Sequence, residues 1–311
     1  MRVYIHIDSN STYVGNGGFV VLSNLALKLI DMGYEVYMFD QNNRLKPKMF
    51  NWLCLDRSIP IIKTWDIILG DDCRVVTSWL RTLPNKFRNP RFLRFLESSE
   101  LIRDGHEAER EFIIKNDVKL ANLHRNLNDL YYRLGIKNMV NLEVWLRDDV
   151  KFNGGAKIEN SVGVQLEKKR VFRLFSVFDW SRYERFTKEN IIVCNGDYRQ
   201  VIDRMNMADF FIHNPKPSPY ISYFSGETFG LPLFEAMACG CVCIARRHRG
   251  IDFLDDIIIL VDDMVEAERW LNRLKEDREL KEEIRERSVR FIEENYRFDD
   301  YRRRVIEEWL E

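Results

Sequence analysis

The chain has 311 residues, 45% of them hydrophobic and 31% charged, and its formal net charge is −1 at pH 7. This length allows two domains with sizeable cores, and the composition is typical of a globular protein. The near-zero net charge argues against bulk nucleic-acid binding. No apolar run approaches the roughly 18 residues that a transmembrane helix requires.

Two further features concern the location of the protein. Residues 1–7 predict a strand rather than a signal peptide. The six cysteines form no C-x-x-C pair and have no His or Cys partners at the spacing of a metal site. We therefore expect buried, reduced thiols in a cytoplasmic protein, and no bound metal.

The N-terminal segment predicts a β-loop-α-β unit. Residues 2–7 form the first expected strand, residues 19–32 an amphipathic helix, and residues 35–40 the second strand. This order is typical of the start of a Rossmann-like domain. Gly17 and Gly18, directly before the helix, allow the backbone to approach a ligand closely, although the same pair suits a plain turn. The loop is not G-x-G-x-x-G, which argues against a dinucleotide site.

The segment 41–141 has a weaker pattern. Residues 65–69 and 74–77 predict short strands, and the alternation of short strands and helices after them favours a parallel sheet covered on both sides. Several cations gather in the same segment, where they form either a solvated face or a contact with an anionic acceptor or membrane headgroups. These cations are Arg81, Lys86, Arg88, Arg91 and Arg94.

A turn-forming segment at residues 150–155 predicts a linker, so we place a domain boundary after residue 152. Beyond it the chain again alternates between strands and helices. The final part is helical and charged, with Trp309 on the apolar side of the last helix. The expected strands are 190–194, 208–213, 242–245 and 257–261, and the expected helices are 198–207, 266–274, 279–294 and 298–310.

The stretch from Gly226 to Gly240 predicts a loop, a helix and the approach to a strand. Pro232 suits the first turn of the helix, and Gly240 suits its C-terminal cap. Two carboxylates lie eight positions apart, Glu227 in the loop and Glu235 in the helix. The free backbone N–H groups and the dipole at the helix N-terminus favour an anion such as a phosphate. An ordinary loop–helix–strand unit with an acidic turn is the alternative.

This stretch resembles the signature of retaining GT-B glycosyltransferases, family 4 in particular. The family motif is E-G-F-G-L-P-x-x-E-A-M-A-x-G, and residues 227–240 read E-T-F-G-L-P-L-F-E-A-M-A-C-G, with Thr228 in place of Gly. The resemblance implies an α/β protein of the GT-B fold, with two Rossmann-like domains facing an interdomain cleft. It assigns residues 1–152 to an N-terminal acceptor domain and residues 153–297 to a C-terminal nucleotide-sugar donor domain. Residues 298–311 are expected to form a helix that crosses back to the N-terminal domain.

The resemblance also implies a hexosyltransferase-like enzyme. It would move a sugar, with retention, from a nucleotide-diphosphate-sugar to a hydroxyl of a glycan, lipid or small molecule. No cofactor, metal or nucleic acid is expected, and the protein would be cytoplasmic, either free or peripheral to the membrane. The alternative from another class is a catalytically degenerate GT-B domain that binds nucleotide or a protein partner. A sugar-nucleotide epimerase or a phosphorylase is a third reading.

Glu227 is the implied catalytic residue, because the first Glu of the family motif binds the transferred sugar and stabilises charge at its anomeric carbon. Glu235 would accept hydrogen bonds from the ribose hydroxyls. The family's Arg and Lys-Gly pattern for the donor diphosphate is missing, so Lys169 and Arg170 are candidates for that cation, although each is also explained as a surface charge. The implied donor-binding residues are Gly17, Gly18, Thr228, Phe229, Gly230, Leu231, Glu235, Lys169 and Arg170.

The sequence gives alternative roles for four of the histidines. Family members often place a His of the N-terminal domain beside the donor sugar, and His106 and His124 are the candidates here. His213 ends a predicted strand, where it either approaches the sugar or is a satisfied structural residue. His248 lies in a basic loop after the following strand, which either contacts the phosphates or is a solvated turn.

Overall fold

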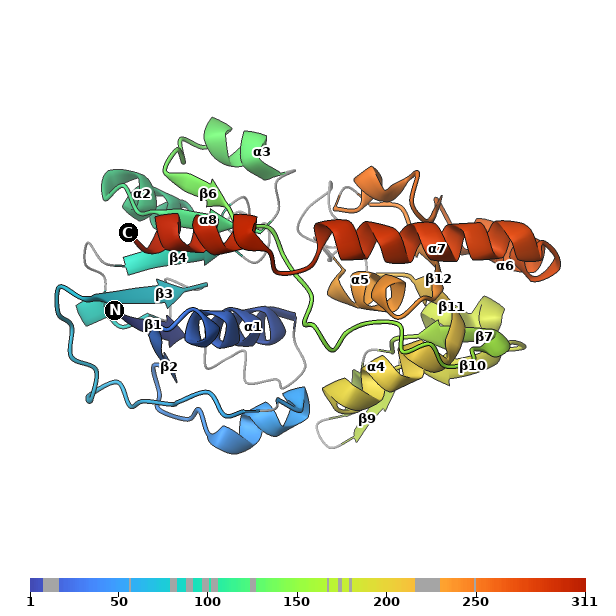
Figure 1. The fold of residues 1–311 in the computed structure, drawn as a ribbon, viewed down its shortest axis with the longest axis horizontal. Coiled ribbons are helices and arrows are strands. Elements are labelled where there is room, and N and C mark those ends of the chain that lie inside the picture. Colours follow the sequence, from blue (N-terminus) through green and yellow to red (C-terminus); the bar gives the residue numbers. More distant parts are fainter. Residues whose placement is uncertain are drawn as a thin grey trace. The chain divides into compact units, whose positions relative to one another are not determined.

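The structure is a computed structural model, and its two compact units are Met1–Val144 with Phe298–Glu311, and Trp145–Arg297 (Figure 1). The boundary expected after residue 152 lies a few residues beyond this division. The described residues are 1–7, 17–55, 57–78, 83–87, 92–96, 101, 106–123, 127–166, 168–172, 175–178, 181–215, 230–248 and 250–311.

The first unit is built on a six-stranded parallel sheet with the order β2-β1-β3-β4-β5-β6. Its strands are β1 (Arg2–His6), β2 (Glu35–Phe39), β3 (Cys73–Thr77), β4 (Phe92–Leu96), β5 (Leu120–Asn122) and β6 (Met139–Asn141). Its helices are α1 (Gly17–Asp31), α2 (Glu107–Lys115), α3 (Asn128–Arg133) and α8 (Asp300–Leu310), with short 3-10 turns at Pro47–Leu53 and Asn85–Phe87.

The last helix, α8, belongs to this first unit. Its N-cap Asp299 accepts a hydrogen bond from the backbone N–H of Arg302 at 2.8 Å. Trp309 is fully buried, and its ring lies 5.8 Å from that of Phe95 on β4. The indole N–H of Trp309 donates to the carbonyl oxygen of Lys119 at 3.4 Å. The apolar side of α8 therefore completes the core beside β4 and β5.

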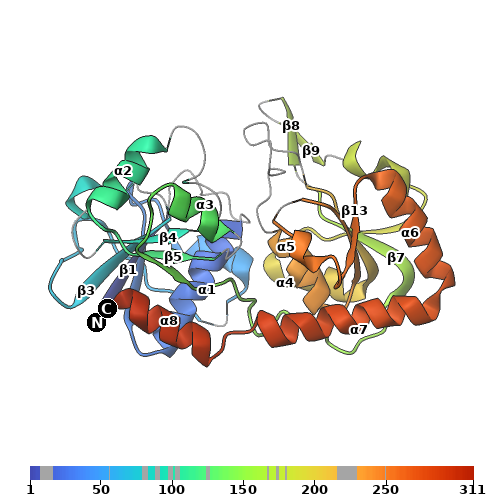
Figure 2. The ribbon, with the colours of Figure 1, turned by 90° about the horizontal axis from the view of Figure 1, so that it is seen from above.

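The second unit is built on a five-stranded parallel sheet with the order β10-β7-β11-β12-β13. Helices α4 and α5 cover one face of this sheet and α6 covers the other (Figure 2). A separate antiparallel hairpin, β8–β9, follows the carboxyl end of β7. The strands are β7 (Ile158–Val164), β8 (Lys168–Phe172), β9 (Phe175–Phe178), β10 (Asn190–Val193), β11 (Ala208–His213), β12 (Val242–Arg246) and β13 (Ile259–Val261). The helices are α4 (Tyr198–Met207), α5 (Leu231–Ala238), α6 (Met264–Glu276) and α7 (Arg278–Asn295), with short 3-10 turns at Ser181–Phe186 and Asp252–Leu254.

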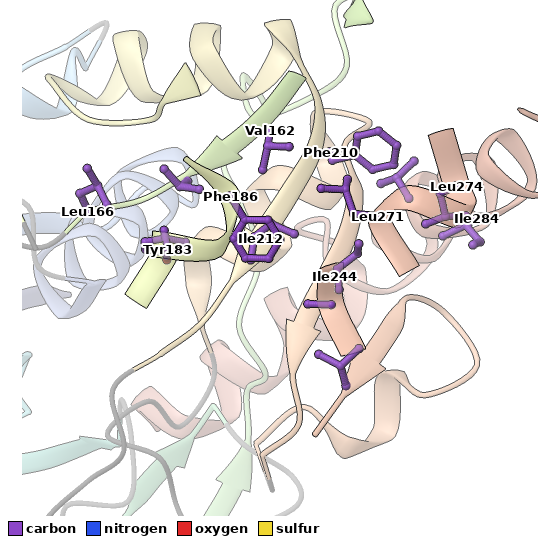
Figure 3. Close-up of a cluster of buried hydrophobic side chains, with 14 residues drawn as sticks. Val162, Leu166, Tyr183, Phe186, Phe210, Ile212, Ile244, Leu271, Leu274 and Ile284 are labelled. Carbon is purple, nitrogen blue, oxygen red and sulfur yellow. The ribbon is translucent and has the colours of Figure 1, made fainter. Parts of the chain in front are cut away.

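Alternate residues of the central strands form the core that Figure 3 shows. Phe210 and Ile212 of β11 and Ile244 of β12 point to the face that α6 covers, as the two-residue period of a strand requires. The other members are Val162, Val164, Leu166, Tyr183, Phe186, Val242, Val261, Ala267, Leu271, Leu274 and Ile284. This core leaves the opposite face of β11 and β12 to α4 and α5.

Helix α7 is tied to the starts of the central strands by a buried carboxylate. Asp209 accepts hydrogen bonds from Arg285 at 2.6 Å, from Lys281 at 3.1 Å, and from the backbone N–H of Asn160 at 2.9 Å. Arg285 also donates to the carbonyl oxygen of Gly240. Burial alone would raise the pKa of Asp209, but these donors hold that pKa below its ordinary value. Asp209, at the start of β11, is therefore a structural residue.

Most predicted elements of the second unit are confirmed, including the helix at residues 198–207 and the strand at 208–213. The prediction of a strand at residues 65–69 is wrong. That segment forms turns and irregular backbone, with Trp65 and Ile68 exposed and Ile67 buried. Its apolar residues resemble a strand in the sequence, yet they pair with none of the strands in the described part of the chain.

Cys239, Cys241 and Cys243 occupy alternate positions in the sequence, as on one face of a strand, but only Cys243 lies within β12, while Cys239 caps α5. All six cysteines are free thiols, and burial raises the pKa of Cys243 well above its ordinary value. Among the described residues, no helix is both long and apolar enough to cross a membrane.

Candidate functional site

The candidate site lies at the carboxyl edge of the second sheet. In open α/β sheets, ligands bind outside the carboxyl ends of the strands. At this edge β11 ends at His213, β12 ends at Arg246, and α4 and α5 begin at Tyr198 and Leu231. Two helix N-termini and two strand ends therefore contribute to the same edge.

The start of α5 depends on Gly230. This glycine has a φ of +75°, a left-handed conformation that residues with a Cβ adopt at a cost. Its carbonyl oxygen accepts a hydrogen bond from the backbone N–H of Leu233 at 2.7 Å. Pro232 occupies the first turn, where its missing N–H removes no helical hydrogen bond. Gly230 thus turns the chain so that the helix N-terminus is formed directly after it.

Glu235 is the buried carboxylate of this helix. Only 3% of the residue is exposed, and its Oε1 atom accepts a hydrogen bond from the hydroxyl of Tyr198 at 2.6 Å. Burial raises the pKa of Glu235 to about 7, although the Tyr198 hydroxyl and Arg147 act in the opposite direction. Near neutral pH the protonated and ionised forms of the carboxyl group are therefore both populated.

Tyr198 is fixed by its position as the first residue of α4. Asp197 and Gln200 form a capping box around it. The Arg147 guanidinium lies over the Tyr198 ring at 4.6 Å, within the range of a cation–π interaction. Arg147 in turn forms an ion pair with Asp149, at 2.9 and 2.5 Å. These contacts place the Tyr198 hydroxyl against Glu235, and no local sequence pattern pointed to either Tyr198 or Arg147.

Two histidines follow the strand ends. The rings of His213 and His248 lie 6.2 Å apart, centroid to centroid. Burial lowers the pKa of His213 to about 3, with further contributions from His248 and Arg182, and burial lowers the pKa of His248 to about 4. Both imidazoles are therefore neutral at physiological pH. The loop after β12 places a buried ring beside His213, whereas the sequence suggested a solvated turn or a phosphate contact.

The predicted site residues fall into three groups. Gly230, Leu231 and Glu235 lie together at the start of α5, while Gly17 and Gly18 begin α1 in the first unit. The backbone places Lys169 and Arg170 on β8 of the hairpin, opposite Val177 and Ser176. Glu227, Thr228 and Phe229 lie outside the described residues, as does His124.

One cation of the basic cluster, Arg94, does not lie on the surface as expected. Arg94 is fully buried on β4, and it forms an ion pair with Glu109 at 2.9 Å. It therefore belongs neither to a solvated face nor to an exposed anion-binding patch. His106 lies 3.2 Å from the other carboxylate oxygen of Glu109, which gives this candidate a structural partner. The part of the chain that the structure describes contains no group of three or more His, Cys, Asp or Glu residues placed to hold a metal.

Comparisons with known proteins support the sequence resemblance. A family model described as "Glycosyl transferase-like" matches residues 162–310. Among solved structures, HepE from Anabaena, in complex with UDP and glucose, is 12% identical, has a TM-score of 0.69 and is matched over 99% of both chains. A glycosyltransferase from Rickettsia africae is 13% identical, has a TM-score of 0.66 and is matched over 99% of this chain and 97% of that chain.

The chain has the GT-B fold, and its residues 162–310 are similar to glycosyltransferases. The predicted α/β fold with two parallel sheets is thereby confirmed over nearly the full length. An uncharacterised glycosyltransferase of Methanocaldococcus jannaschii is 24% identical over 243 residues. That alignment covers 76% of this chain and only 56% of the relative. The chain thus spans little more than half the length of the curated relative.

Proposed function

We propose that this protein is a retaining glycosyltransferase of the hexosyltransferase type. It transfers a sugar from a nucleotide-diphosphate-sugar to a hydroxyl of a glycan, lipid or small molecule. The observation that carries the proposal is the start of α5, where Gly230 forms a helix N-terminus and Glu235 lies buried against the Tyr198 hydroxyl. A structural neighbour, HepE from Anabaena in complex with UDP-glucose, supports a nucleotide-sugar as the donor.

The proposed roles follow from the charge of the donor. We propose that the N–H groups at the start of α5 bind the diphosphate, and that Thr228, Phe229, Gly230 and Leu231 are donor-binding residues. The ionised carboxylate of Glu235 accepts hydrogen bonds from the ribose hydroxyls, which is the charge-assisted and stronger form of that contact. Lys169 and Arg170, on the hairpin after β7, are the candidate cations for the leaving diphosphate. We propose Gly17 and Gly18, at the start of α1, as further donor-binding residues.

In the reaction, the bond between the anomeric carbon and the diphosphate oxygen breaks, and a bond to the acceptor oxygen forms on the same face of the sugar. The acceptor proton passes to the leaving phosphate oxygen. Glu227 binds the transferred sugar and stabilises the positive charge that develops at the anomeric carbon. Backbone N–H groups and cations neutralise the leaving group, so we propose that the reaction needs no metal.

The proposed setting is the cytoplasm, because all six cysteines are free thiols. We further propose residues 1–152 as the acceptor domain and residues 153–297 as the donor domain. For lipid acceptors we also propose contact with a membrane surface through the basic cluster, in which Lys86 is exposed and Arg81, Arg88 and Arg91 lie outside the described residues.

A catalytically degenerate domain that binds nucleotide or a protein partner is the second candidate. It is favoured by the missing Arg and Lys-Gly pattern of the family, for which Lys169 and Arg170 on β8 are the only candidates that the sequence offered. Release of sugar from any donor, with or without an acceptor, would exclude this candidate.

The test is a thermal-shift and turnover screen with uridine, guanosine and adenosine diphosphates and their hexose conjugates, in the presence and absence of a chelator. We expect one nucleotide series to raise the melting temperature and one conjugate to release sugar. Glu227→Gln should abolish turnover while nucleotide binding persists. The proposal fails if no nucleotide or nucleotide-sugar shifts the melting temperature, and metal independence fails if the chelator abolishes turnover.

A further inference from the structure

Two unsatisfied histidines lie where β11 and β12 end. His213 and His248 are each more than nine-tenths buried, with 8% and 7% exposed. Within the described residues, the Nε2 atom of each ring is buried and has no hydrogen-bond partner. A buried polar atom without a partner costs about 1–3 kcal/mol. Two such atoms on neighbouring rings, at the edge where α/β proteins bind ligands, indicate a partner from outside the chain.

The hydrogen-bonding polarity of His248 is fixed by its surroundings. Its Nδ1 atom accepts a hydrogen bond from the backbone N–H of Gly250 at 3.2 Å. Because burial lowers the pKa of His248 to about 4, the ring is neutral at pH 7 and carries a single proton. An accepting Nδ1 places that proton on Nε2. His248 therefore directs a buried N–H donor toward the end of the sheet.

Asn214, the residue after His213, supplies the opposite polarity. Its Nδ2 atom donates to the carbonyl oxygen of Arg182 at 3.0 Å, which fixes the orientation of the amide. Arg182 returns a hydrogen bond to the carbonyl oxygen of Asn214 at 2.7 Å. The Oδ1 atom of Asn214 is buried and has no hydrogen-bond partner among the described residues. Asn214 thus adds an acceptor directly after His213 in the chain.

We propose that His213, Asn214 and His248 bind neighbouring hydroxyl groups of the sugar carried by the nucleotide donor. The inference rests on the proposed function, and it assigns the transferred sugar to the ends of β11 and β12. A sugar hydroxyl both donates and accepts, so one hydroxyl satisfies the His248 N–H and another satisfies Asn214 Oδ1. The Nε2 atom of His213 donates or accepts according to its tautomer. Sequence alone left His213 between a sugar contact and a satisfied structural residue, and its unpaired Nε2 favours the contact.

The chemistry of the cluster favours hydroxyls over a phosphate. Both rings are neutral at pH 7, and the acceptor oxygen of Asn214 would repel an anion. The positive group beside His213 is Arg182, whose charge helps to keep His213 neutral. A phosphate at this place would instead draw protons onto the rings, and its binding would strengthen as the pH falls.

The experiment measures the sugar increment, defined as the ratio of the dissociation constants of a nucleoside diphosphate and of its hexose conjugate. The probes are UDP with UDP-glucose, and the guanosine and adenosine pairs, each titrated into the full chain by calorimetry at pH 6, 7 and 8. The variants are His213→Leu, His248→Leu, His248→Gln and Asn214→Leu. Ile244→Val is the control for a mild loss of packing, because Ile244 lies in the core on the face of β12 that α6 covers.

We expect each Leu variant to reduce the increment by about 3- to 10-fold, the effect of one lost hydrogen bond, while binding of the diphosphate alone is unchanged. His248→Gln, which restores an N–H near the place of Nε2, should recover part of the increment, and Ile244→Val should keep it. The increment should be independent of pH, because neither ring titrates between pH 6 and 8.

Several results would overturn the subsite. An unchanged increment in the Leu variants would mean that the histidines contact only water, and an equal loss in Ile244→Val would make the effect one of packing. A contribution of the histidines to the increment that grows toward pH 6 would mean that they bind an anion. If the wild type shows no increment, the sugar is not bound by these residues. If no nucleotide binds the wild type at all, the proposed function and the subsite fail together. If diphosphates bind the wild type and the Leu variants have the wild-type sugar increment, the subsite is wrong and the proposed function stands.

Discussion

Two buried carboxylates of the second unit differ in almost everything except burial. Asp209, at the start of β11, has 2% of its surface exposed, and Glu235, in α5, has 3%. Asp209 is bound by Arg285, Lys281 and a backbone N–H, and its pKa is lowered. Among the described residues, only the Tyr198 hydroxyl donates a hydrogen bond to the carboxylate of Glu235. Burial raises the pKa of Glu235 to about 7.

The difference separates a structural carboxylate from a functional one. The chain supplies Asp209 with the cations that compensate its desolvation, and the result is an attachment of α7 to the sheet. Glu235 lacks that compensation, so its ionised form is costly until a ligand provides donors. The carboxylate of Asp209, at the amino edge of the sheet, is thus satisfied by the chain itself. At the carboxyl edge, His213, Asn214 and His248 each carry a buried polar atom without a partner among the described residues.

The largest expected effect comes from removing the charge of Asp209. Asp209→Asn leaves Arg285 and Lys281 buried beside a neutral amide, so we expect a loss of about 3–5 kcal/mol in the free energy of unfolding. The matched change, Glu235→Gln, should leave stability unchanged or raise it at pH 8, because it removes an uncompensated buried charge. Urea unfolding of the two variants measures the contrast, and equal losses would erase the distinction between the two carboxylates.

The pH dependence of stability sharpens the same contrast. The pKa of Glu235 is about 7 in the folded protein, against 4.5 as the ordinary value, so the folded state holds the proton more tightly. The free energy of unfolding should therefore fall as the pH rises from about 4.5 to 7, by about 3 kcal/mol from this group. Asp209 acts with the opposite sign, because its contribution is lost as the pH falls through its lowered pKa.

Unfolding of the wild type and Glu235→Gln at half-unit pH steps isolates the contribution of Glu235. Relative to the wild type, the free energy of unfolding of the variant should increase between pH 4.5 and 7. Above pH 7 the difference between the two proteins should stay constant. A constant difference across this range would mean that the pKa of Glu235 is not raised.

Tyr198→Phe tests the hydrogen bond that holds Glu235. The phenol donates to the ionised carboxylate and lowers the pKa of Glu235, so its removal should raise that pKa by about one unit. The carboxyl titration, followed by NMR of side-chain labelled protein, should shift accordingly. Tyr183→Phe is the control, since Tyr183 donates to the carbonyl oxygen of Gln165 and not to a carboxylate. An identical shift in both variants would argue against a direct contact.

The smallest expected effect concerns the turn before α5. Gly230→Ala places a Cβ on a residue with a φ of +75°, at a cost of about 1 kcal/mol. Gly33→Ala, with a φ of +88° at the end of α1, should cost a similar amount, because an added Cβ there meets no atom within 4 Å. Only Gly230→Ala should also weaken nucleotide binding, as calorimetry would show. Equal nucleotide affinity in both variants would remove Gly230 from the site.

Sequence patterns were sufficient for the elements with strong periodicity and clear caps. The strand Ala208–His213 and the helix Tyr198–Met207 lie where they were expected, because Asp197 caps the helix and the centre of the strand, residues 210–212, is apolar. Gly240, expected to end a helix, adopts the left-handed conformation. The apolar segment around Trp65 failed as a strand, since hydrophobicity alone does not provide a partner strand.

The site was predictable only in part. The two-Glu motif locates Gly230 and Glu235 through their spacing along the chain. The contact of Tyr198 with Glu235 joins residues 37 positions apart, and the stacking of Arg147 on Tyr198 joins a third segment. No local pattern encodes such contacts, because they arise from the packing of α4 on α5. The unpaired atoms of His213 and His248 likewise became visible only when their neighbours were known.

The most direct measurement is the affinity of the best-binding nucleoside diphosphate for the wild type and Glu235→Gln, titrated by calorimetry from pH 5.5 to 8.5. If Glu235 binds the ribose as an ionised carboxylate, the wild-type affinity should rise through pH 7 beyond any rise seen in the variant, and the two should differ about 10-fold at pH 8. Identical affinities and identical pH profiles would contradict the placement of the nucleotide at the carboxyl edge of the second sheet.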